Sequence, residues 1–276
     1  MQTPEGNWMS ASEEEPRSFG ANAPQSSAVM APAWHTVVLI AAIIAISATG
    51  AARMTGAHRV VHRLGTYAIT AAMELAMLAW VWFGLRWKKT PLRALLGAKR
   101  NDARSMALDF GIAAMFWIGS MMVLGTLAIT WSVIAAEITH RPLLGANGQP
   151  TAEQERTIRT LAQLAPANGA EMAAWALLCA IAGFVEETVF RGYFQRQFTA
   201  WGKGRVAAGA VFSALMFGAA HGYEGARSMF LIAVFGALFS GLAIFRGSLR
   251  PGIMAHCWHD LITGVALAIL KWQHFF

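Results

Sequence analysis

Charged residues are scarce in this chain. Only 13% of its 276 residues are Asp, Glu, Lys or Arg, whereas 56% are hydrophobic. A soluble domain contains roughly 25% charged and about 45–50% apolar residues. The composition therefore excludes an ordinary soluble domain and places the chain in the membrane class.

Cysteine is nearly absent as well, since the chain contains only Cys179 and Cys257. Both lie in apolar segments, and their spacing is not typical of metal ligands. The pair therefore indicates neither a disulfide framework nor a cysteine-based metal site. The chain also lacks a visible internal repeat, and this argues against a transporter built from matched halves.

Acidic residues are outnumbered, and the formal net charge is +7. A basic balance can indicate nucleic-acid binding. Here the lysines and arginines gather in loops beside apolar runs, as the positive-inside rule predicts for membrane proteins. We therefore expect membrane lipid as a partner and no nucleic acid.

The N-terminus lacks the basic region of a secretory signal. Its first 33 residues contain four glutamates and a single basic residue, Arg17. They are rich in small and polar residues and have too little apolar surface to order themselves. We predict a disordered tail over residues 1–33 and a membrane-embedded domain over residues 34–276 that begins with a retained helix.

Seven apolar segments follow the tail. Each is close to the roughly 20 residues that a helix needs to span a bilayer. We therefore predict an all-α, polytopic bundle of about seven transmembrane helices. The segments cover residues 35–52, 67–87, 107–136, 171–190, 206–222, 228–246 and 252–270.

The distribution of basic residues predicts the orientation of these helices. Residues 86–104 contain seven lysines and arginines, so this segment is expected on the cytoplasmic side. Alternating helices from there places 14 of the 22 basic residues inside. We predict a multi-pass protein of a bacterial inner membrane with its site toward the cytoplasm.

Two glutamates and an arginine interrupt the fourth apolar segment. Ionisable groups inside a membrane helix are costly and usually functional. Glu187 and Arg191 stand four residues apart with the acid N-terminal, the favourable order for an ion pair on one helix face. We expect this pair to support the site. Glu186 points about 100° away and lacks that partner.

Two further patterns occur on later apolar segments. One places His221 at the end of a helix, and the other places His256 and Asp260 on one helix face. Glu186 and His221 lie about 17 and 18 residues from the intervening turn, so their depths should match. His256 follows its own turn by only about five residues. The helix carrying Glu186 must therefore project beyond the bilayer if the three segments are to meet.

These residues supply the groups that amide hydrolysis requires. A base must take a proton from water, and donors must stabilise the oxyanion that forms. Glu186 is the natural base because Glu187 is already paired with Arg191. We therefore expect peptide-bond hydrolysis as the reaction class.

The three patterns resemble the motifs of the CPBP family, which contains the CAAX proteases and bacteriocin-processing enzymes. The resemblance covers about residues 170–272, the expected protease core. It consists of Glu186-Glu187-x-x-x-Arg191, Phe217-x-x-x-His221 and His256-x-x-x-Asp260, with Ser248-Leu249-x-Pro251 before the third motif.

This resemblance implies an intramembrane, glutamate-dependent endopeptidase. Its substrate would be a membrane-associated protein or peptide, as in the CAAX prenyl proteases. Glu186 and His221 would activate water, while His256 and Asp260 would hold the oxyanion. Glu187 and Arg191 would support that arrangement.

One position differs from the CAAX-cleaving members, which typically have Asn where Asp260 stands. An ionised Asp cannot donate a hydrogen bond to an oxyanion. Asp260 must therefore be protonated, orient His256 or bind a metal. A zinc site of Glu186, His221, His256 and Asp260 is an alternative, although the His-Glu-x-x-His spacing is missing. We favour a mechanism without metal or cofactor.

A noncatalytic protein is the rival interpretation. A membrane immunity or transport partner would use the same buried Glu and His residues to relay protons or to bind a peptide without cutting it. Glu74 adds an unpaired acid in the middle of the second apolar segment. We expect it either to line the same cavity or to form a hydrogen bond with a neighbouring helix.

Overall fold

The apolar segments fold into helices, as their composition predicts. In this computed structural model the described residues are 28–54, 62–97, 102–140, 142–143 and 163–273. Within these ranges there are only helices, turns and one isolated bridge between Gly97 and Ser248. The predicted all-α polytopic fold is confirmed.

Six helical stretches are long and apolar enough to cross a bilayer, and a shorter apolar helix joins them in the described part of the chain. The long stretches are α1 (Ala33–Met54), α2 (Arg63–Trp87), α3 (Ala103–Thr139), the continuous run of α5 (Gly169–Glu186), η3 (Glu187–Phe194) and α6 (Gln195–Trp201), then α8 (Ala226–Arg246) and α9 (Arg250–Trp272). The shorter helix is α7 (Val206–Ala220), and two short 3-10 helices are η1 (Leu92–Leu96) and η4 (Gly222–Glu224). The protein is therefore a multi-pass membrane protein.

The helices expose large apolar side chains, as a lipid environment permits. On α3, Ile138 is 74%, Met115 71% and Met122 70% exposed. Exposure of this kind is unfavourable in water, because apolar surface is driven out of it. Exposed Trp34 and Trp87 meet with ring centroids 5.4 Å apart where α1 begins and α2 ends. Tryptophans at such positions are typical of the membrane–water interface.

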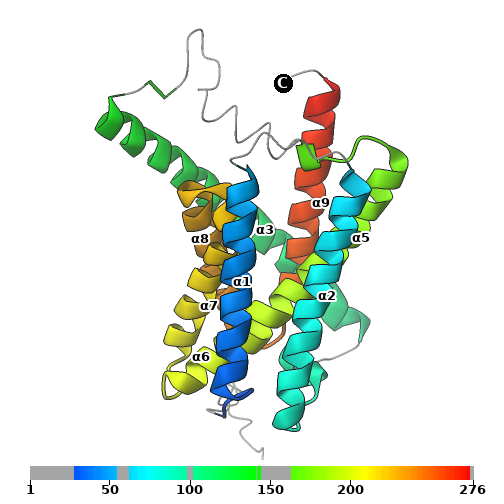
Figure 1. The fold of residues 1–276 in the computed structure, drawn as a ribbon, viewed down its shortest axis with the longest axis vertical. Helices are drawn as coiled ribbons and strands as arrows, with labels where there is room; N and C mark the ends of the chain where they lie inside the picture. Colours follow the sequence, from blue (N-terminus) through cyan, green and yellow to red (C-terminus); the bar gives the residue numbers. More distant parts are fainter. Residues whose placement is uncertain (1–27, 55–61, 98–101, 141, 144–162, 274–276) are drawn as a thin grey trace, which may run out of the picture.

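Successive spans run in opposite directions. The start of α1, the end of α2 and the turn between α6 and α7 lie together at the bottom of Figure 1. The turn between α8 and α9 joins them, because the amide of Leu249 donates to the carbonyl of Leu96 in η1. We call this the basic end. It carries residues 86–97, 191–205 and 247–251, which belong to the segments that the charge distribution assigns to one side.

Ion pairs fasten α3, α8 and α9 at the basic end. Asp109 on α3 is buried and accepts from Arg246 Nε at 2.6 Å and from Arg250 Nη1 at 2.9 Å. Arg196 of α6 donates to the backbone carbonyls of Ala94 and Leu95. These contacts fix the turn from which α9 starts, and α9 carries the third motif.

The predicted N-terminal tail is described only in part, since residues 1–27 lie outside the described ranges. Met30 and Ala31 are buried, and the amides of both donate to Gln197 Oε1, at 2.6 and 3.3 Å. Gln197 Nε2 in turn donates to the carbonyl of Ala31. Packing against α6 therefore begins before the helix itself, a few residues upstream of the predicted boundary at residue 34.

Candidate active site

The first motif lies where an α-helix changes to a π-helix. α5 ends at Glu186, and η3 from Glu187 to Phe194 is π-helical. Such segments are rare and occur frequently at functional sites. Every residue of η3 is buried, so the neighbouring helices enclose it.

The helical run that carries this motif is longer than a bilayer requires. It extends over 33 residues from Gly169 to Trp201. At about 1.5 Å per residue this is roughly 50 Å, against about 30 Å of hydrocarbon. This length agrees with the expected projection of the helix, and the first and third motifs do meet.

The predicted ion pair between Glu187 and Arg191 is present and buried. Arg191 Nη1 donates to Glu187 Oε1 at 2.9 Å, and both side chains are at most 1% exposed. Arg191 Nη2 donates to the carbonyl of Gly236 at 3.3 Å. The guanidinium also lies 4.2 Å from the ring centroid of Phe217 and 5.0 Å from that of Phe239, in cation–π geometry. The pair thus joins η3 to α7 and α8.

His256 on α9 connects this pair to the other carboxylates. Its Nδ1 lies 3.0 Å from Glu187 Oε1. A carboxylate that pairs with an arginine only accepts hydrogen bonds, so Nδ1 carries the hydrogen and donates it. Nε2 then lies 3.6 Å from Glu186 Oε2 and 3.8 Å from Asp260 Oδ2. Glu187 therefore sets the orientation in which the ring presents Nε2 to two carboxyl groups.

His221 lies at the C-terminal cap of α7, beside the same aromatic ring. Its Nδ1 is 2.9 Å from the carbonyl of Phe217, to which it donates. The ring centroid of Phe217 lies 5.0 Å from that of His221 and 5.9 Å from that of His256. The structure thus places both imidazoles around Phe217. No direct hydrogen bond joins His221 to Glu186 in the described part of the chain.

Tyr223 and Glu224 stand two and three residues after His221, and no sequence motif singled them out. Burial, together with the nearby carboxyl groups of Glu224 and Glu186, raises the pKa of the Tyr223 phenol well above its usual value. Burial also raises the pKa of the Glu224 carboxyl, against the influence of His221. The phenol of Tyr223 and the carboxyl group of Glu224 lie close enough to influence each other's protonation. Adjacency to the motif histidine was the only sequence signal for this pair.

Ser47 on α1 holds the turn that carries His221. Its hydroxyl donates to the carbonyl of Ala219 at 2.8 Å and accepts from the amide of Gly222 at 2.9 Å. A Cβ on Gly222 would lie 2.8 Å from that hydroxyl oxygen, so the close approach requires glycine. A single serine in an apolar helix carried no sequence signal for this role.

The alternative zinc site would bring together Glu186, His221, His256 and Asp260. Among the described residues, no group of three or more His, Cys, Asp or Glu has an arrangement that could hold a metal ion. Whether a metal takes part stays a prediction, and the chelator experiment described below tests it.

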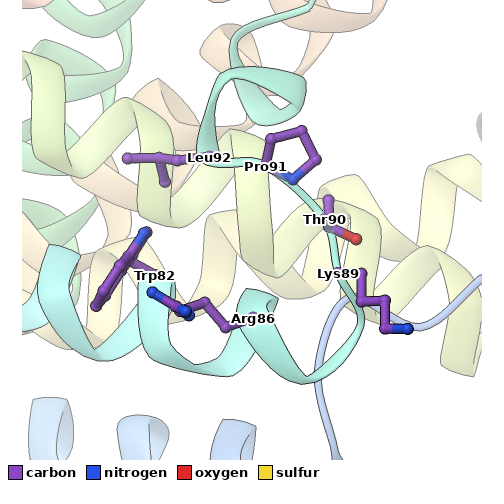
Figure 2. Close-up of a pocket in the computed structure, with 6 residues that line it drawn as sticks. All are labelled: Trp82, Arg86, Lys89, Thr90, Pro91 and Leu92. Atoms are coloured by element: carbon purple, nitrogen blue, oxygen red, sulfur yellow. The ribbon is translucent and has the colours of Figure 1, made fainter.

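A shallow pocket lies elsewhere, at the end of α2, and Figure 2 shows the side chains around it. It has a volume of about 390 Å³ and contains none of the predicted site residues. Arg86 lies 4.9 Å from the Trp82 ring centroid, a basic and aromatic pairing typical of a membrane interface. The lining residues are Trp82, Arg86, Lys89, Thr90, Pro91 and Leu92.

Comparison with known proteins agrees with the motifs. Residues 168–262 match the family model described as type II CAAX prenyl endopeptidase Rce1-like. The matched segment begins at Asn168, the N-cap of α5, and ends two residues after Asp260. It therefore contains every predicted site residue. No curated protein and no solved structure matches the chain.

Proposed function

Because residues 168–262 match the model of the Rce1-like type II CAAX prenyl endopeptidases, we propose that this protein is a glutamate-dependent intramembrane endopeptidase. It hydrolyses one peptide bond of a membrane-associated protein or peptide. The observation that carries the proposal is the orientation of His256, held through Nδ1 by Glu187 with Nε2 facing Glu186 and Asp260. This arrangement supplies a base and an oxyanion donor side by side.

In the proposed mechanism Glu186 takes a proton from water, assisted by His221. The water oxygen bonds to the carbonyl carbon of the substrate, and the negative charge moves to the carbonyl oxygen. His256 Nε2–H and the protonated carboxyl of Asp260 donate to this oxyanion. The C–N bond then breaks, and Glu186 returns its proton to the leaving amine. No metal or cofactor is required for any of these steps.

We place the protein in a bacterial inner membrane with the site accessible from the cytoplasmic side. The gathering of basic segments at one end of the bundle supports this orientation. A bacterial membrane holds no prenylated protein, so the proposed substrate is a peptide or a protein segment at the membrane surface.

Digestion of a membrane-peptide library tests this function. The purified protein in proteoliposomes is incubated with the library, with and without chelator, and mass spectrometry identifies the products. We expect defined internal cleavage that persists with chelator. Loss of cleavage with chelator would contradict the metal-independent mechanism. No cleavage by folded protein would favour the noncatalytic interpretation.

Replacement of Asp260 by Asn is expected to keep at least about a third of wild-type kcat, because the amide also donates to an oxyanion. Replacement by Leu removes the donor and is expected to reduce kcat by about 10²–10³-fold, as for other oxyanion donors. Steady-state kinetics of both variants with one cleaved peptide measure this difference. Equal activity of Asp260→Leu and wild type would contradict the oxyanion role.

Replacement of Gly183 by Ala is expected to reduce kcat by about 10-fold or more, because misplacement by 1 Å can cost about 10²-fold. An added Cβ would lie 2.5 Å from Cys257 Sγ and 3.0 Å from the Cys257 amide nitrogen. α5 and α9 must therefore separate, and with them Glu186 and His256. Gly241→Ala is the matched control, since nothing lies within 4 Å of its Cβ. Equal kcat in both variants would contradict this requirement for close packing.

A further inference from the structure

Glu74 lies on α2, outside the segment that matches the family model. Its carboxyl oxygen Oε2 is buried and has no hydrogen-bond partner among the described residues. A buried polar atom without a partner is rare and calls for an explanation. Packing of α2 against apolar helices alone would not retain a carboxyl group at this depth.

Glu186 carries the complementary atom. Its Oε2 is likewise buried without a hydrogen-bond partner, and its carboxyl group is close enough to that of Glu74 for the two to interact electrostatically. His256 and Asp260 on α9 also interact electrostatically with Glu74. The acid on α2 therefore faces the candidate active site.

α2 is held firmly in this position. It packs against α5 and η3, and the Tyr67 hydroxyl donates to the carbonyl of Leu164. The Tyr67 ring also meets Trp175 of α5 with centroids 5.3 Å apart. Glu74 is two helical turns further along the same helix, so its approach to Glu186 follows from the helix packing.

A carboxylate oxygen can only accept a hydrogen bond, so two facing carboxyl groups need a proton between them. Two carboxylates that share a site do not both ionise, because like charges repel. Glu186 must be ionised to accept a proton from water. The proton therefore belongs on Glu74, which then donates to Glu186.

We propose that Glu74 is a positioning residue that, in its protonated form, donates a hydrogen bond to Glu186 and holds it toward the attacking water. This inference rests on the proposed function and adds a residue from outside the family-matched segment. During turnover Glu186 gains one proton from water and returns one proton to the leaving amine. Glu74 keeps its own proton throughout.

Kinetics of three variants test the proposal. Glu74→Leu removes the donor and is expected to lower kcat by about 10–100-fold with little change in KM. Glu74→Gln retains a donor of similar shape and is expected to stay within about threefold of wild-type kcat. Glu137→Gln, an exposed glutamate of α3, is the matched control. Wild-type kcat in Glu74→Leu, or equal losses in the Leu and Gln variants, would overturn the proposal.

Infrared spectroscopy detects the proton shared by Glu74 and Glu186 and needs no substrate. At neutral pH the carbonyl stretch of a protonated carboxyl is expected in the wild type, absent in Glu74→Gln and shifted in Glu186→Gln. Asp260→Asn identifies the separate band of Asp260, and Glu137→Gln should change nothing. The proposal would be overturned if the carbonyl band kept its position and intensity in both Glu74→Gln and Glu186→Gln. If the band changes as expected but no peptide is cleaved, the proposed endopeptidase function is wrong. The proton shared by Glu74 and Glu186 is then still supported.

Discussion

Replacement of Glu186 by Gln is expected to lower kcat for peptide cleavage by roughly 10³-fold, within the range of general-base effects. The amide has nearly the shape of the carboxylate but cannot take a proton from water. Substrate contacts are retained, so the peptide should still bind and KM should change little. Steady-state cleavage in proteoliposomes measures the effect.

The control for this variant is Glu137→Gln, which makes the same chemical change at an exposed position on α3. Its kcat is expected to equal that of the wild type. The thermal unfolding midpoint of Glu186→Gln should also stay near the wild-type value, because the amide has nearly the same shape and its oxygen can still accept the hydrogen bond proposed from Glu74. Retained turnover in Glu186→Gln would mean that another group is the base.

Replacement of Arg191 by Met is expected to destabilise the fold by about 3–5 kcal/mol, the usual consequence of breaking a buried ion pair. Glu187 would be left as an uncompensated buried charge, and the cation–π contacts with Phe217 and Phe239 would be lost. Denaturant titration in detergent micelles measures the free energy of unfolding.

Two comparisons sharpen this prediction. Arg63→Met breaks the peripheral pair with Glu171, whose side chains are 22% and 13% exposed, and should cost no more than about 1 kcal/mol. The double variant Glu187→Met/Arg191→Met should recover part of the stability, because no lone charge remains. It should stay inactive, since His256 loses the acceptor that orients it. Equal stability of Arg191→Met and Arg63→Met would contradict this account.

The fold could be predicted from the sequence because membrane helices are a local property of the chain. Each of the seven predicted apolar runs overlaps an apolar helix in the described part of the chain, and six of these helical stretches are long enough to cross a membrane. The ion pair of Glu187 and Arg191 was predictable for the same reason, since it depends on spacing within a single helix.

The surroundings of this pair were not predictable, because they join segments far apart in the chain. Phe239 of α8 lies under Arg191, Ser47 of α1 fixes the turn after His221, and Glu74 of α2 interacts electrostatically with Glu186. None of these residues stands in a local pattern that indicates its partner. Glu74 stands out in the sequence as an unpaired acid, but no local pattern decides between its two expected roles.

The π-helix could not be predicted from the sequence for a different reason. Its residues, Glu187 to Phe194, also fit an ordinary amphipathic α-helix, and the change in backbone bonding leaves no mark on the residue types. The ion pairs of Asp109 with Arg246 and Arg250 at the basic end were not predicted. Counting lysines and arginines only assigns loops to a side of the membrane and does not identify their partners. Both the π-helix and the ion pairs of Asp109 depend on contacts between segments far apart in the chain.

The most direct measurement is a single turnover of one cleaved peptide in water enriched in ¹⁸O, with wild type and Glu186→Gln in parallel. The account predicts two fragments from the wild type, with ¹⁸O from water in the new carboxyl group, and intact peptide bound to Glu186→Gln. Mass spectrometry of the purified complexes distinguishes these results. Cleavage by Glu186→Gln at the wild-type rate would contradict the central claim that Glu186 activates the water.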